Sequence, residues 1–545
     1  MDQTSKSKNV KDTLYEWAIQ SKILNKAFGT TDSKEEIDEI HSLLQKLFSE
    51  ENKDVVKAKL YKKLWGSRCQ FGPLPPFELL QEFEKDGVYH KDYRDHTTHS
   101  LFTCFLGLYI YENNSTIKDS FSDFIEKNFS TKKKDEQEEI FVSLWLLSSL
   151  YHDIGYLVEN KKIEDKKSDA FKRFKEKIDG LLCTPLANTL SFSEQISTSI
   201  ESQFINDSCI AHKNLNSIDD IEINFDLLKS ASDYSGLTRK DQDINGIKQY
   251  YDFAASHQTL NGRPSFRDHG ISSALLLLYI WTSFREYIAN LCLKNYDKYY
   301  SYCWEKIQSL NNKLKEEISE HIIIAAAQAI SLHNIIKKSL WDEEETLSKS
   351  LTLSSFRIML KGGDTAMPLA FLLRLCDELQ VWDRPRFRLL SENDNDLTSQ
   401  DISIIALNDT ISLRFFKDED LLINPDGKHS WYYKLHEVLQ PYFNPEEFNA
   451  LLTYETYHIV SDGSGKFLRL FRDEIQHNTD KNSQNYNLIL LGNLLSKGHY
   501  ETFPKSKTKI TKEEPVPIDL ASLLDENLNL KNILGLKHEK RNQKQ

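Results

Sequence analysis

Hydrophobic residues recur at helical spacing through most of the first 390 positions, as in Ile37, Ile40, Leu43, Leu44 and Leu47. Glycine and proline, which interrupt helices, are sparse in the same region. The pattern therefore predicts a mainly α-helical body. We expect its central helices at residues 97–112, 138–152, 270–293, 320–337 and 366–380.

Charged or polar stretches separate these helices, at residues 118–139 and 159–177, and a longer polar section runs from about 160 to 260. Pieces of the long section, such as INFDLL, still offer an apolar face. We therefore expect a partly helical insertion that packs against the helical core, and not a linker.

The pattern changes after about position 390. Two β-rich runs at 401–416 are separated by Asn408-Asp409, which is typical of a hairpin, and helical patterns follow in SWYYKLHEVLQPYF and PEEFNALLTYETY. NYNLILLGNLL fits another strand or a buried helix. The sequence thus predicts an N-terminal helical region (1–90), a helical domain (91–390), a small α+β domain (391–515) and a polar, basic tail (516–545).

Composition narrows the class of protein. The 545 residues carry a formal net charge of -13 and no stripe of interleaved aromatic and basic residues, which disfavours duplex nucleic acid as a partner. The seven cysteines are scattered without a Cys-x-x-Cys pair, as in a reduced, cytoplasmic protein. The first residues lack the apolar core of a signal peptide, and the most apolar stretch, Gly270–Phe284, is shorter than the ~20 residues of a bilayer span. We expect no membrane association.

Histidine and aspartate recur on or beside the most apolar helices. The positions are His96, His99, His152, Asp153, His269, His333 and Asp377. Taken alone, each is more often a core residue whose polar atoms are hydrogen-bonded than a metal ligand, and Asp377 could simply pair with Arg374. Together they indicate a metal site, because buried imidazoles and carboxylates are costly unless they pair or bind a cation. This donor set, without thiolates, favours Mn, Fe, Mg, Co, Ni or Zn over copper(I).

The order of these residues resembles the HD superfamily of metal-dependent phosphohydrolases over residues 93–388. His99 matches the family's first histidine, His152 and Asp153 match its His-Asp doublet, and Asp377 matches the last aspartate. His269 and His333 fall where two-metal members have two more histidines. The resemblance implies two divalent ions on these six residues, with Asp153 bridging, and hydrolysis of a nucleotide phosphoester or phosphoanhydride by a metal-bound water.

Other positions near the motifs carry alternatives. His96 competes with His99 as the first ligand and otherwise lies on the substrate side as a catalytic residue, while Asp95 or Asp268 could orient imidazoles. The basic residues that could meet substrate phosphate are Arg94, Arg267, Arg374 and Lys361, with Arg263, Arg384 and Arg386. The competing interpretation of each arginine is an ion pair with a neighbouring aspartate.

The resemblance is incomplete at two points. The gaps from Asp153 to His269 and from there to His333 are longer than in compact members, so insertions must be looped out for the ligands to converge. Ile154, Gly155 and Tyr156 follow the doublet where cyclic di-GMP-specific members have Gly-Tyr-Pro, which speaks against that substrate.

Several functions remain open from the sequence. Within the resemblance, the substrate is either a phosphodiester or, as in the triphosphohydrolases, a (deoxy)nucleoside triphosphate. The alternative from another class is a catalytically inactive, nucleotide-sensing scaffold. Because members of the family also occur in bacterial conflict systems, the resemblance implies a role in anti-phage defence as well. The C-terminal residues 391–545 are expected to regulate the enzyme or to assemble a homo-oligomer, or else to complete the packing of the core.

Overall fold

The computed structural model of the chain describes part of every region. The described residues are 9–30, 33–49, 53–66, 80, 95–156, 259–260, 263–264, 268–293, 316–334, 358–361, 367–380, 382, 398–415, 435–436, 438–461, 466–472, 500–504 and 518–519. The insertion expected at about 160–260 therefore lies outside the described residues except for 259–260, as does the segment NYNLILLGNLL. No helix in the described ranges is both long enough and apolar enough to cross a bilayer.

The chain forms two compact units. One comprises Leu14–Arg386 and Leu439–Phe448, and the other comprises Met1–Thr13, Phe387–Val438 and Asn449–Gln545. The first unit is helical and the second carries the strands of an α+β structure. The predicted fold class, mainly α with a small C-terminal α+β part, is confirmed.

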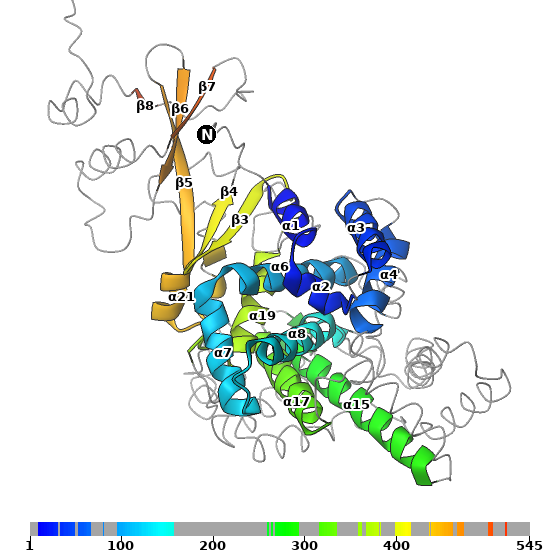
Figure 1. Cartoon of the computed structure of the whole chain (residues 1–545). Helices are drawn as coiled ribbons and strands as arrows, with labels where there is room; N and C mark the ends of the chain where they lie inside the picture. The colour runs from blue at the N-terminus through cyan, green and yellow to red at the C-terminus, as the bar shows by residue number, and fades with distance from the viewer. Residues whose placement is uncertain are drawn as a thin grey trace, which may run out of the picture. The chain divides into compact units, whose positions relative to one another are not determined.

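All five predicted central helices are present (Figure 1). They are α6 (His96–Asn113), α8 (Lys134–Tyr151), α15 (His269–Leu293), α17 (Glu316–His333) and α19 (Met367–Leu379). The N-terminal region adds α1 (Val10–Ala18), α2 (Lys22–Phe28), α3 (Lys34–Phe48) and α4 (Lys53–Gly66). The short strands β1 (Thr259–Leu260) and β2 (Arg263–Pro264) pair with each other in antiparallel register.

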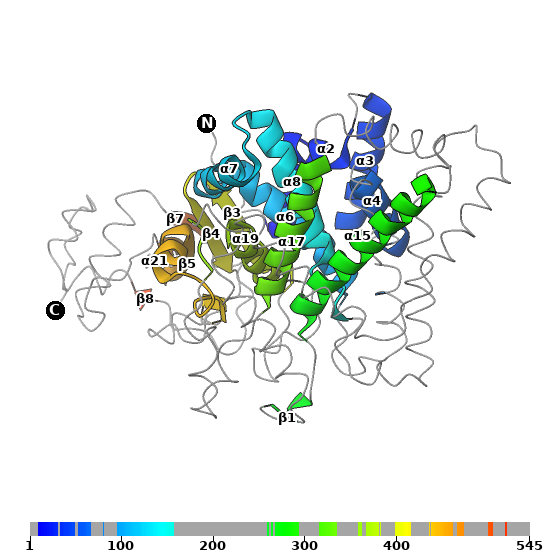
Figure 2. The same ribbon diagram turned by 90° about the horizontal axis from the view of Figure 1, so that it is seen from below.

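The core of the helical unit lies around α8. Nearly every residue of α6 and α8 from the second turn onward is buried, as expected for helices that are apolar on all sides. Helix α17 packs against α15, α8 and α19, and α6 packs against α8 and α19 (Figures 1 and 2). Where α6 crosses α8, Gly107 leaves room for the Trp145 ring, whose Nε1 donates to Cys104 O at 2.8 Å.

The polar stretch predicted at 118–139 contains a further helix, α7 (Ser115–Phe129). Its apolar residues Ile117, Phe121, Phe124 and Ile125 follow helical spacing and are fully buried. Asn114 caps its first turn by accepting a hydrogen bond from Ile117 N at 2.9 Å. The helix is therefore amphipathic, with its charged residues on the outer face.

The α+β unit is built on a six-stranded sheet. Its strands are β3 (Ile402–Leu407), β4 (Thr410–Phe415), β5 (Leu452–Ser461), β6 (Lys466–Arg472), β7 (Tyr500–Pro504) and β8 (Ile518–Asp519). The order is β3-β4-β5-β6-β7, β8 pairs with β5, and β4 and β5 run parallel. The predicted hairpin is confirmed: Leu407 faces Thr410 across the turn, and Asn408 takes a left-handed φ of 52°.

The helix predicted over PEEFNALLTYETY is wrong in its second half. Helix α21 begins at Pro445 and ends at Leu451. Asn444 Oδ1 caps its first turn by accepting hydrogen bonds from Glu446 N and Glu447 N. Strand β5 then begins at once at Leu452. The residues TYETY are rich in β-formers, and β4 and β6 give the segment two hydrogen-bonding neighbours, so the tertiary pairing overrides the helical pattern.

Candidate metal centre

The ends of five helices bring the predicted site residues together. His96 and His99 lie in the first turn of α6, and His152 and Asp153 follow the last residue of α8. The remaining three lie at the start of α15, at the end of α17 and in the last turn of α19: His269, His333 and Asp377. Polar side chains can occupy these positions because helix ends leave backbone groups unpaired and need polar partners.

The start of α6 is held by a partly buried ion pair. Asp95 caps the helix by accepting from Thr98 N at 2.8 Å, and Lys57 Nζ lies 3.1 Å from Asp95 Oδ2. Burial raises the pKa of Asp95, but Lys57 and the hydrogen bonds from Thr98 and Thr97 outweigh it and lower the pKa to about 2. The carboxylate therefore stays charged and fixes the helix turn that carries the two histidines.

The turn after α8 is pinned to the first turn of α15. The Ser273 hydroxyl donates to His152 O at 2.6 Å and accepts from Gly155 N at 2.7 Å. Gly155 lies so close to α15 that a Cβ atom would come within 2.6 Å of Ser273 N and closer still to His269 O. This contact sets the separation between the His-Asp doublet and His269.

Asp268, predicted as a catalytic or orienting residue, caps α15. Its Oδ1 accepts from Ile271 N at 3.0 Å and its Oδ2 from Asn334 Nδ2 at 3.2 Å. The same Asn334 nitrogen lies 3.1 Å from His269 Nδ1. In this arrangement neutral His269 keeps its hydrogen on Nε2, so a cation at Nε2 requires the hydrogen bond between Asn334 and His269 Nδ1 to break.

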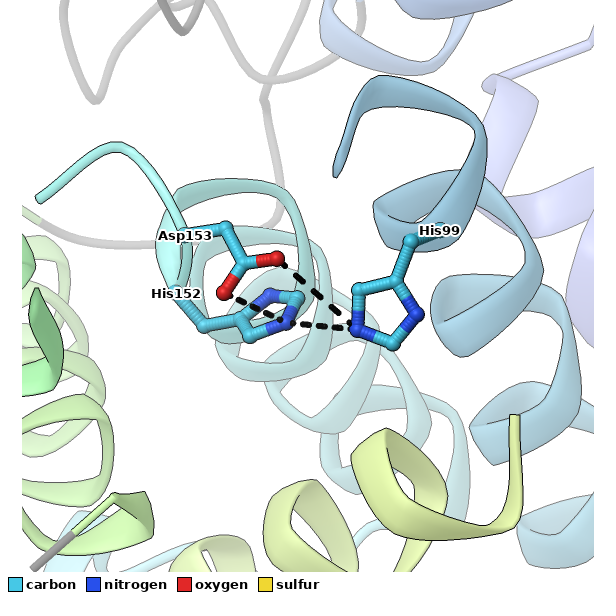
Figure 3. Close-up of side chains that lie close together, drawn as sticks. All are labelled: His99, His152 and Asp153. Carbon is cyan, nitrogen blue, oxygen red and sulfur yellow. Dashed lines mark hydrogen bonds and ion pairs between the residues drawn. The ribbon is translucent and has the colours of Figure 1, made fainter. Parts of the chain in front are cut away.

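One group of three residues offers ligand atoms within 4.8 Å of one another: His99, His152 and Asp153 (Figure 3). The two histidine Nε2 atoms are 3.3 Å apart, and Asp153 Oδ1 is 3.4 Å from His152 Nε2. Asp377 joins the group, with its Oδ1 at 2.8 Å from His99 Nε2 and 3.9 Å from His152 Nε2. Two imidazoles and two carboxylates thus surround one point.

The Nδ1 atoms of this group already have acceptors. His152 Nδ1 donates to Ser149 O at 2.8 Å, and His99 Nδ1 donates to Gln380 Oε1. A carbonyl oxygen only accepts, so both hydrogens lie on Nδ1, and in the neutral rings each Nε2 presents a lone pair to the other.

A second group shares Asp153 and adds His269 and His333, again with ligand atoms within 4.8 Å. His333 Nδ1 donates to Ile330 O at 2.6 Å, and its Nε2 is buried without a hydrogen-bond partner among the described residues. Burial lowers the pKa of His333 to about 3, so the ring is neutral. An orphaned, buried lone pair of this kind fits a metal ligand.

The carboxylates of the site are ionised. Burial raises the pKa of Asp153, but the imidazoles of His152, His96 and His99 outweigh it and hold the pKa well below its usual range. The pKa of Asp377 is lowered in the same way by His99, His152 and Arg374 against the effect of burial. Positive charge from the surrounding imidazoles and Arg374 keeps these carboxylates ionised, and a divalent ion among the same groups would supply that charge, so these residues fit such an ion.

His96 occupies a place beside the two groups. Its Nδ1 lies 3.0 Å from Asp153 Oδ2, while His99 provides the nitrogen that faces His152. Tyr156 lies between two imidazoles, with ring centroids 4.0 Å from both His96 and His269. Of the two histidines that compete for the first ligand position, His99 is the one placed within the first group.

Of the predicted phosphate-binding residues, the structure describes the side chains of Arg374 and Lys361. Arg374 is buried, donates to Glu378 at 2.6 Å, lies 3.5 Å from Asp377 Oδ2 and stacks over the Tyr442 ring at 4.2 Å. Lys361 is exposed, and its backbone N donates to Glu447. Arg94, Arg267, Arg384 and Arg386 lie outside the described residues, as do the side-chain contacts of Arg263.

Four contributors escaped the sequence prediction: Tyr156, Ser273, Asn334 and Gln380. Each lies within four residues of a predicted ligand. Gln380 follows Asp377 by three positions and Ser273 follows His269 by four, which places them near the ligand on a helix. Position relative to the ligands is therefore the signal that could have found them.

No protein-family model matches this chain, and it has no significant match to a curated protein or to a solved structure.

Proposed function

We propose that this chain is a metal-dependent phosphohydrolase of the HD type that hydrolyses a nucleotide phosphoester or phosphoanhydride. One observation carries the proposal. Residues in the chain order His, His-Asp, His, His, Asp approach one point from five helix ends, in two groups of ligand atoms that share Asp153. The ion pairs expected of ordinary core residues do not explain His333 Nε2, which is buried without a hydrogen-bond partner among the described residues.

The residues divide into two ligand sets. His99, His152, Asp153 and Asp377 would hold one divalent ion, and Asp153, His269 and His333 would hold a second. Nitrogen and carboxylate donors suit manganese, iron, cobalt, nickel, zinc or magnesium. When bound, such a pair of ions lowers the pKa of a water molecule and neutralises charge that develops on phosphoryl oxygens.

The remaining side chains position the reacting groups. His96 is paired with Asp153 Oδ2 and borders the shared carboxylate, so we assign it proton transfer with the leaving oxygen of the substrate. Asp268 and Asn334 orient His269, and Ser273 holds the doublet against α15. Arg374 is committed to Glu378 and Asp377, so in the proposal it orients Asp377 and does not meet substrate phosphate.

Two experiments on the full-length protein test the proposal together. Elemental analysis measures bound metal, and a panel of cyclic dinucleotides, linear oligonucleotides and (deoxy)nucleoside triphosphates is assayed for hydrolysis with added Mn²⁺. Products separate the two substrate classes, because triphosphohydrolase activity releases triphosphate and a phosphodiesterase opens a diester. Metal binding without turnover on any substrate would favour the inactive nucleotide-sensing alternative.

The double variant His152→Ala/Asp153→Ala removes His152 from the first ligand set and Asp153 from both sets. We expect it to lose hydrolysis and metal while circular dichroism stays unchanged, since both residues follow the end of α8 and lie outside its apolar middle. Asp135→Asn, at the exposed start of the same helix, is the matched control and should keep full activity. Equal activity of the double variant and the wild type would refute the mechanism.

A further inference from the structure

His99 faces two competing hydrogen-bond partners. Its Nε2 lies 2.8 Å from Asp377 Oδ1, and its Nδ1 faces Gln380 Oε1. A neutral imidazole has a single hydrogen. If that hydrogen were on Nε2, it would be donated to Asp377, and Nε2 could not bind a cation.

Two other histidines of the site, His152 and His333, do not meet this problem. His152 and His333 come at or just after the ends of α8 and α17, where the last carbonyls have no helical partner, and each donates Nδ1–H to such a carbonyl, Ser149 O or Ile330 O. His99 lies in the first turn of α6, where the unpaired backbone groups are N–H donors. An acceptor for its Nδ1–H must therefore come from another side chain.

Gln380 is that acceptor, and its orientation is fixed from behind. Gln380 Nε2 donates to Trp382 O at 3.1 Å, which leaves Oε1 pointing at His99. Turning the amide over would set two oxygens, Oε1 and Trp382 O, against each other. Gln380 is 2% exposed and His99 1% exposed, so bulk water does not compete for these groups.

We propose that Gln380 is a positioning residue that keeps the hydrogen of His99 on Nδ1 and thereby presents Nε2 as a ligand for a divalent ion. The inference rests on the proposed function, because it concerns the ion held by His99, His152, Asp153 and Asp377. Gln380 does not touch the ion. It acts through the His99 ring, in the way that acceptors behind metal-binding histidines generally fix their tautomer.

The test compares Gln380→Met with Gln380→Glu in the full-length protein, using Mn²⁺ titrated against a competing chelator. Both variants lose the donor to Trp382 O, but only Glu keeps an oxygen acceptor facing His99 Nδ1. We expect Gln380→Met to weaken one Mn²⁺ site by roughly 10–100-fold, the usual effect of removing such a partner. Gln380→Glu should bind Mn²⁺ at least as tightly as the wild type.

Gln137→Met is the matched control. Gln137 is also buried and its Nε2 also donates to a backbone carbonyl, Thr131 O, at 3.1 Å, but it lies in the first turn of α8, at the opposite end from His152. Its substitution removes the same groups from the interior and should leave Mn²⁺ affinity unchanged. A general effect of losing a buried amide is thus separated from an effect on His99.

Each result decides. Wild-type protein that binds neither Mn²⁺ nor any of the other divalent ions named above would refute the proposed function itself. Wild-type binding with an unchanged Gln380→Met affinity would overturn only the role of Gln380, and so would an equal loss in the Met and Glu variants, since the effect would then run through Trp382. If Gln380→Met does not fold by circular dichroism, Gln380→Asn, whose amide is one methylene short of His99, takes its place in the same comparison.

Discussion

The Nε2 atoms of His99 and His152 lie 3.3 Å apart, one in the first turn of α6 and the other just past the end of α8. With both Nδ1 hydrogens held by carbonyl oxygens, the neutral form of each ring directs the lone pair of its Nε2 at the other ring. Asp153 and Asp377 add two carboxylates to the same space. A cation between these four groups converts mutual repulsion into ligation, so the folded protein should depend on the ion for part of its stability.

We therefore expect Mn²⁺ to stabilise the protein against unfolding and a chelator to reverse the effect. Ion at one hundred times its dissociation constant would add about 2.7 kcal/mol to the free energy of unfolding. Asp153→Asn, which alters the carboxylate common to both ligand groups, should abolish the ion-dependent increase, and Asp135→Asn should not. Urea unfolding with and without Mn²⁺ measures the difference, and an Asp153→Asn protein that still gains stability from Mn²⁺ would contradict the ligand assignment.

Ser273→Ala should destabilise the protein and weaken ion binding together. The substitution leaves His152 O and Gly155 N without the buried hydroxyl that pairs both, at a cost of about 1–3 kcal/mol for each group left unsatisfied. Ser143→Ala is the control, because the Ser143 hydroxyl bonds only to Glu139 O within α8. We expect chemical denaturation to show a small loss for Ser143→Ala and a large one for Ser273→Ala; equal losses would mean that the bridge contributes nothing.

The Asp95–Lys57 pair predicts a dependence of stability on pH. The pKa of Asp95 falls from 3.8 to about 2 on folding, so the carboxylate stabilises the folded state fully above its unfolded pKa and loses this contribution as pH falls through about 2. The shift corresponds to at most about 2–3 kcal/mol. Asp95→Asn keeps the cap on α6 but does not titrate, so the stability difference between wild type and variant should shrink as pH falls from about 5 to about 2. A difference independent of pH would contradict the lowered pKa.

Much of this fold follows from local sequence. The five central helices were predictable because α6, α8, α15, α17 and α19 are long, apolar and nearly free of glycine and proline. The hairpin at Asn408 follows from turn chemistry that needs only neighbouring residues. Strand β5 was missed because its extended form depends on β4 and β6, and no local pattern contains those partners.

The candidate site likewise has residues that local sequence predicts and residues that it does not. Its predicted ligands were visible because a histidine or aspartate beside an apolar helix has a cost that demands an explanation. The acceptor of the His99 Nδ1 hydrogen was not visible in the sequence, because Gln380 lies 281 residues from His99. A single glutamine just after a helix does not by itself indicate a role in a metal site. The partners of Arg374 were visible in part: Asp377 and Glu378 lie one helical turn away, but Tyr442 comes from a distant segment.

Gly155 provides the sharpest test of how the doublet is placed. An alanine Cβ at this position would lie within 2.6 Å of Ser273 N and 2.8 Å of the His269 carbonyl carbon, and it would overlap the His269 oxygen. These are backbone atoms of α15 and cannot rotate aside. We therefore expect Gly155→Ala to cost about 1–3 kcal/mol or more, typical of overpacking, and to move Asp153 away from His269.

Gly29→Ala makes the same chemical change where space is not the obstacle. Gly29 caps α2 with a left-handed φ of 62°, so alanine there should cost about 1 kcal/mol through backbone strain alone. Urea unfolding and Mn²⁺ titration of both variants separate the two effects. Gly29→Ala should lower stability and keep wild-type Mn²⁺ affinity, whereas Gly155→Ala should lower both, because the ions proposed here share Asp153 and need it held against α15. Unchanged Mn²⁺ affinity in a folded Gly155→Ala protein would show that the doublet does not depend on this contact.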